Sequence, residues 1–140
     1  LDTLIPWLQQ ADWLKISTDE AIALFETDDI TQLSRQFPDA QLLMTDGEKG
    51  CQHLLAGSVP AFSVNSIETT GAGDAFLAAF VHQLSQRDWQ VPTRTELERI
   101  LTFANAMGAL TTLKPGAIAA LPTREELLVF LKKQTDYPWA

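Results

Sequence analysis

The sequence contains very little cysteine and no long apolar segment. Cys51 is its one cysteine, so no disulfide can form within the chain, and with two distant histidines it makes no metal-binding pattern. No window approaches the roughly 18 consecutive apolar residues that indicate a membrane-spanning helix. The N-terminal segment lacks the basic start and the small-residue cleavage site of a secretory signal. We therefore expect a cytoplasmic protein that has no membrane partner.

Basic residues are also scarce. The chain of 140 residues has 10 Lys and Arg against 18 Asp and Glu, which gives a net charge of −8. Because this charge repels a nucleic-acid backbone, we expect no nucleic-acid partner. A phosphate ligand is not excluded, since backbone N–H groups can bind one locally inside an acidic protein. Hydrophobic residues at 46% and charged residues at 20% are typical of a globular domain with a real core.

Apolar spacing predicts strands mainly in the middle of the chain and helices mainly in its C-terminal half. Short apolar runs between turn residues predict strands at 11–16, 41–45, 51–55 and 59–64, the last two joined around Gly57 and Ser58. Helical spacing and two capping boxes, at Ser17 with Glu20 and at Thr123 with Glu126, predict helices at 3–10, 17–25, 29–37, 71–85, 97–111 and 123–133. No linker divides this pattern, which indicates an α/β layer fold in one domain.

A loop of small residues leads directly into the helix predicted at 71–85. The loop reads Thr-Thr-Gly-Ala-Gly over 69–73, and Asp74 follows it. Glycines allow a ligand to approach the backbone closely, and the first N–H groups of a helix have no partner within the helix. Together they can bind a phosphate. A carboxylate beside that phosphate suits a base that removes a proton from an attacking hydroxyl.

Other interpretations of the loop remain. It could be a plain turn in which Asp74 only complements the helix dipole. A dinucleotide-binding G-x-G-x-x-G motif is disfavoured because the third glycine position is Phe76, although a dinucleotide-dependent oxidoreductase stays a weaker hypothesis. A P-loop is excluded because no Gly-Lys-Ser/Thr follows.

Residues 69–76 resemble the C-terminal signature of the ribokinase-like (PfkB) carbohydrate kinases, and of fructokinases in particular. Three further blocks resemble the same family in the same order, at 15–20, 45–50 and 105–117. The resemblance implies a ribokinase-like three-layer fold with a mostly parallel central sheet. It also implies ATP-dependent phosphorylation of a sugar hydroxyl.

The resemblance assigns roles to particular residues. Asp74 would be the catalytic base, and Gly71, Ala72 and Gly73 would offer N–H groups to the γ-phosphate. The remaining ATP contacts would come from Lys15, Thr45, Gly47, Gly50, Asn105 and Gly108.

Two metal sites are implied by the same resemblance. Glu20 would act on Mg²⁺ through water. Carbonyl groups around five residues would hold a monovalent cation, usually K⁺: Glu68, Thr70, Thr111, Lys114 and Gly116. The family usually has Asp where this chain has Glu68, and the extra methylene moves the carboxylate, so we expect only the carbonyl of Glu68 to take part.

Members of this family are about twice as long as this chain, which starts with Leu1 rather than Met. We therefore expect a C-terminal portion of a kinase, truncated on its N-terminal side, with most of the sugar pocket and the lid in the missing half. Its partners would be a small sugar and ATP. Alone, the chain would be inactive, bind only nucleotide or phosphate, and self-associate through the face left exposed by truncation.

Overall fold

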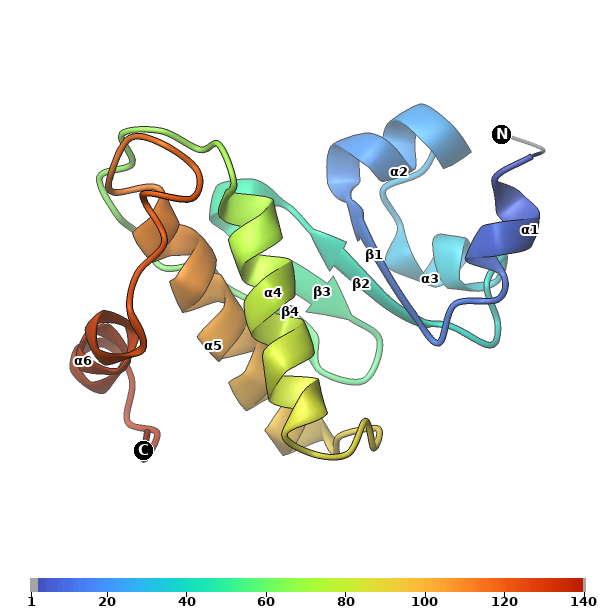
Figure 1. Cartoon of the computed structure of the whole chain (residues 1–140). Helices are drawn as coiled ribbons and strands as arrows, with labels where there is room; N and C mark the ends of the chain where they lie inside the picture. The colour runs from blue at the N-terminus through green and yellow to red at the C-terminus, as the bar shows by residue number, and fades with distance from the viewer. Residues whose placement is uncertain (1–2, 140) are drawn as a thin grey trace. The chain divides into compact units, whose positions relative to one another are not determined.

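The computed structural model describes residues 3–139, drawn in colour in Figure 1. The chain divides into two compact units, Leu1–Val59 and Pro60–Ala140. Each unit is described by itself. The prediction of a single domain therefore stays a prediction. No helix among residues 3–139 is long and apolar enough to cross a membrane.

The first unit is a small α/β sheet. Three helices, α1 (Ile5–Leu8), α2 (Thr18–Phe25) and α3 (Ile30–Ser34), accompany four strands in the spatial order β1-β2-β3-β4. β1 (Trp13–Ser17) and β2 (Gln41–Thr45) are parallel, with Ser17 opposite Thr45. β3 (Cys51–His53) and β4 (Gly57–Val59) continue the sheet as an antiparallel meander after a 3₁₀ turn at Gly47–Lys49.

The core of the first unit lies on one face of β1 and β2. Side chains alternate across a strand, so the even-numbered residues of both strands share this face. They pack with residues of the helices in one buried cluster: Leu14, Ile16, Ala21, Leu33, Phe37, Leu42 and Met44. The opposite face carries the buried side chains of Leu43, Cys51, His53 and Val59. Two apolar faces explain why the β2 sequence is a continuous apolar run.

The strand predicted at 59–64 is wrong. β4 ends at Val59, and Gly57 and Ser58, which were expected in the turn, belong to this strand instead. Pro60 has no N–H to donate to a ladder, which explains the end of the strand. Residues 60–64 have no regular secondary structure.

The described residues of the second unit, 60–139, form irregular segments and three helices. α4 (Ala72–Ser85) packs along α5 (Arg94–Thr111), and α6 (Arg124–Gln134) also contacts α5 (Figure 1). The buried positions of α4 recur at spacings of three and four, as the sequence predicted. The largest fully buried side chains of the unit are Phe80, Leu84, Leu97, Leu101 and Leu131.

The α/β fold class is confirmed, and within residues 3–139 the sheet is mixed. One strand pair is parallel and two are antiparallel, so the mostly parallel sheet expected from the resemblance is not what these four strands form. The two predicted capping boxes start α2 and α6 as expected. A third one, in which Glu96 accepts from the N–H and hydroxyl of Thr93, starts α5 three residues before the predicted position.

Candidate functional site

The glycine loop ends in the N-cap of α4. Gly71 has a φ of 81°, a left-handed conformation that residues with a Cβ rarely adopt. Its carbonyl accepts the N–H of Ala75 at 2.9 Å, which closes the first helical turn. Asp74 lies in this turn and is exposed, so its carboxylate is not in the packed interior.

The backbone N–H groups of the loop differ in what they can still bind. The N–H of Ala72 donates to the carbonyl of Thr69 at 3.1 Å, so it can reach a phosphate only by giving up this bond. Gly73 and Asp74 occupy the next positions of the first turn, where helical N–H groups have no partner within the helix. These two are therefore the donors best placed for an anion, with the positive end of the α4 dipole behind them.

Hydrogen bonds tie the segment before the loop to the segment after α5. The carbonyl of Thr112 accepts the N–H groups of Ile67 at 2.8 Å and Glu68 at 3.2 Å. The carboxylate of Glu68 accepts the N–H of Gly116 at 3.0 Å, which links the same two segments a second time. The backbone of residues 67–68 is thereby fixed relative to residues 112–116.

Two glycines allow the closest approaches at this junction. A Cβ on Gly71 would lie 2.9 Å from the Cβ of Ala117, and one on Gly108 would lie 3.2 Å from the carbonyl oxygen of Ala72. Gly108 thus lets α5 pack against the start of α4. The predicted adenine contact of Gly108 stays a prediction, but its packing role is visible in the structure.

The other predicted residues of this unit are also engaged in the structure. The Nδ2 group of buried Asn105 donates to the carbonyl of Pro60 at 3.1 Å, and its predicted contact with adenine stays a prediction. The hydroxyl of Thr111 donates to the carbonyl of Met107, and Lys114 forms an ion pair of 3.2 Å with Glu126. Thr70 adds a side-chain hydrogen bond to Glu68.

The predicted residues of the first unit gather where β1 and β2 end. Because these strands are parallel, their carboxyl ends meet at one edge, the usual ligand position in open α/β sheets. The hydroxyl of Thr18 donates to the carbonyl of Thr45 at 3.3 Å across this edge. Gly47 and Gly50 have φ values of 47° and 100°, and they allow the tight turn that follows β2.

The carboxylate of Glu20 forms hydrogen bonds with Ser17 at the same edge of the sheet. One carboxylate oxygen, Oε2, accepts the N–H of Ser17 at 2.7 Å and its hydroxyl at 2.8 Å. These bonds, with the positive charge of Lys15 3.9 Å away as a smaller cause, hold the pKa of Glu20 below its usual range. The second oxygen, Oε1, is outside these bonds, and the predicted action of Glu20 on Mg²⁺ stays a prediction.

No group of three acidic, cysteine or histidine side chains among residues 3–139 could hold a metal ion.

A model of the pfkB family carbohydrate kinases matches residues 1–124, and the chain belongs to this family. Among its relatives, the probable fructokinase-3 of Arabidopsis thaliana is 44% identical over 132 residues. The match covers 89% of this chain but only 38% of that relative. The chain therefore spans well under half of the relative's length.

Solved structures agree with the family. The aminoimidazole riboside kinase of Salmonella enterica, complexed with aminoimidazole riboside and an ATP analogue, matches with a TM-score of 0.80 and 28% identity, over 93% of this chain and 45% of that one. A double mutant of the fructokinase of Vibrio cholerae O395, with fructose, ADP and potassium bound, has a TM-score of 0.79 and 32% identity, over 93% and 44%. The ribokinase-like fold is thereby confirmed.

Sequence reasoning missed the contacts that hold the glycine loop in place. The hydrogen bond between Glu68 and Gly116 joins residues 48 positions apart, and no local sequence pattern predicts such a pair. The family difference at Glu68 was the available signal. From the sequence we expected the carboxylate of Glu68 to take no part in the cation site. The structure shows that this longer side chain reaches the backbone N–H of Gly116.

The Glu68 carboxylate is expected to make stability depend on pH. The N–H of Gly116 and the hydroxyl of Thr70 hold the pKa of Glu68 below its usual range. A carboxyl group with a lowered folded pKa contributes stability that is complete above about 4.5 and is lost as the pH falls through the folded value. Urea unfolding of the wild type and Glu68→Gln should therefore show a gap that is widest near neutral pH and shrinks below it. A gap that is constant between pH 7 and pH 3 would contradict this role.

Proposed function

We propose that this chain is the ATP-binding and catalytic-base portion of a fructokinase-like carbohydrate kinase, which transfers the γ-phosphoryl group of ATP to a sugar hydroxyl. Both units would belong to one catalytic domain. The location of the protein in the cytoplasm also stays a prediction.

The observation that carries the proposal is the position of Asp74. An exposed carboxylate lies in the first turn of α4, beside N–H groups that have no partner within the helix and a loop held by Glu68 and Thr112. In phosphoryl transfer the protein mainly positions the reactants and stabilises charge. Asp74 would accept the proton of the sugar hydroxyl as its oxygen attacks, while the N–H groups of Gly73 and Asp74 stabilise the charge on the transferring group.

ATP, Mg²⁺ and a monovalent cation are the proposed cofactors. Thr45, Gly47 and Gly50 would line the nucleotide from the edge of the first unit, with Lys15 and Glu20 beside them. Mg²⁺ neutralises phosphate charge when it is bound. Carbonyl oxygens suit K⁺, and the hydrogen bonds between residues 67–68 and 112–116 join segments that carry candidate carbonyls. These features support the proposal, as do the ligands of the two solved relatives.

A second candidate applies to the chain on its own. Because it spans 38% of its plant relative, the 140 residues by themselves are expected to take up nucleotide or phosphate without turnover. Side chains such as Leu77 and Val81 form an exposed apolar stripe on α4, which supports self-association of the isolated chain. Sizing chromatography that gives a monomer at high concentration would argue against the association.

Two measurements test the proposal. Calorimetry of the chain with ATP and Mg²⁺ should give saturable binding. A fusion that adds the part of the Arabidopsis relative that the chain does not span should phosphorylate one or more sugars of a panel, in a coupled assay for ADP. Nucleotide binding without turnover by a correctly folded fusion would favour the binding-only alternative.

A further inference from the structure

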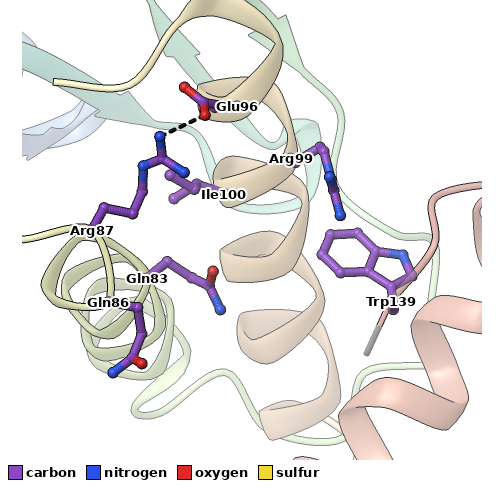
Figure 2. A pocket seen from close by; sticks show the side chains of 7 residues that line it. All are labelled: Gln83, Gln86, Arg87, Glu96, Arg99, Ile100 and Trp139. Atoms are coloured by element: carbon purple, nitrogen blue, oxygen red, sulfur yellow. Dashed lines mark hydrogen bonds and ion pairs between the residues drawn. The ribbon is translucent and has the colours of Figure 1, made fainter. Parts of the chain in front are cut away.

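A groove of about 290 Å³ lies at the end of α4 farthest from Asp74. Gln83, Gln86 and Arg87 line it from α4 and the turn after it, and α5 and Trp139 complete it (Figure 2). With a rise of 1.5 Å per residue, the 14 residues of α4 place the groove about 20 Å from the glycine loop. It is therefore separate from the proposed catalytic site.

Two arginines give the groove its positive charge. The guanidinium of Arg87 pairs with Glu96, whose pKa is lowered to about 2, first by the N–H and hydroxyl of Thr93 and then by Arg87. Glu96 is thus ionised and offsets only one arginine. Arg99 has no acidic partner among the described residues; its guanidinium carbon lies 5.5 Å from the ring centroid of Trp139, and Figure 2 shows the two side chains next to each other.

Both arginines keep unused hydrogen-bonding capacity. Within residues 3–139 the buried Nε groups of Arg87 and Arg99 have no acceptor. Unpaired buried donors are rare in folded proteins, and each costs free energy. The side-chain amides of Gln83 and Gln86 add donors and acceptors at the α4 side of the groove, and the indole of Trp139 adds an apolar wall.

We propose that this groove binds a small phosphate ester of the sugar-phosphate type. Guanidinium groups bind phosphate in planar, charge-assisted pairs. The two glutamine amides suit sugar hydroxyls, and an aromatic wall is usual in small-molecule sites. The proposal is independent of the proposed kinase activity, because none of its residues belongs to the catalytic machinery.

The test follows the indole N–H signal of Trp139 by NMR while fructose 6-phosphate is added to the 140-residue chain. The signal is identified by its loss in Trp139→Phe. It is expected to shift and saturate, whereas fructose without phosphate should leave it in place. Gln83→Glu adds a negative charge to the groove with little change in volume and should weaken binding about tenfold, which corresponds to about 1.4 kcal/mol.

Gln36→Glu is the matched control. It makes the same chemical change at an exposed position of the first unit and should leave the affinity unchanged. No movement of the Trp139 signal at millimolar fructose 6-phosphate would overturn the proposal. So would an equal shift with fructose, or equal affinities for Gln83→Glu and the wild type. Binding that moves signals of the glycine loop but not that of Trp139 would assign the ligand to the catalytic site instead.

Discussion

Asp74→Asn is expected to lower kcat by about 10²–10⁴-fold, the usual contribution of a general base. The kcat is that of the fusion of this chain with the part of the Arabidopsis relative that it does not span. The amide has nearly the shape of the carboxylate but cannot accept the proton of the sugar hydroxyl. Because the N–H groups of Gly73 and Asp74 remain in the first turn of α4, ATP affinity should change little. The measurement is steady-state turnover by the fusion described above, paired with calorimetry of ATP binding.

Asp39→Asn serves as the matched control for Asp74→Asn. Asp39 is exposed, lies in the turn before β2 and has no proposed role, so its replacement should leave kcat unchanged. Turnover by Asp74→Asn at the rate of the wild type would remove Asp74 as the base. A loss of ATP affinity equal to the loss of kcat would instead assign Asp74 to ligand binding or to the integrity of the loop.

Much of the fold could be predicted because its signals are local. The apolar run of β2, the helical spacing of α4 and the capping boxes at Ser17 and Thr123 each depend on a few neighbouring residues. The same capping pattern at Thr93 and Glu96 was available and was overlooked, which is why the predicted start of α5 was late. The end of β4 also had a local cause in Pro60, but the apolar residues after it suggested a continuing strand.

The candidate site is harder to predict because its contacts are distant in sequence. The loop motif and Asp74 were found from their spacing and from the family resemblance. Two contacts depend on how α5 packs beside α4: the hydrogen bond between Glu68 and Gly116, and the close approach of Gly71 to Ala117. No short sequence pattern predicts this packing. The use of Asn105 to hold the carbonyl of Pro60 is a contact of the same kind.

Gly71→Ala is expected to destabilise the second unit by about 2–5 kcal/mol. A side chain at a φ of 81° costs about 1–2 kcal/mol, and forcing a methyl group into a filled space adds about 1–3 kcal/mol. The new Cβ would stand 2.9 Å from the Cβ of Ala117 and 3.2 Å from its Cα, so the backbone itself has to move. Urea unfolding followed by circular dichroism of the helices measures the loss.

Gly116→Ala separates backbone strain from crowding in the same unit. Gly116 also has a positive φ, of 89°, but a Cβ there meets only the Cβ of Ala119 at an ordinary 3.6 Å. Gly116→Ala should therefore show the strain alone, about 1–2 kcal/mol. Because moving the segment at Gly71 also displaces the N–H groups of Gly73 and Asp74, Gly71→Ala should also weaken ATP binding at a urea-free condition where the variant is folded. Equal losses of stability for the two variants would show that the contact between Gly71 and Ala117 does not hold the loop.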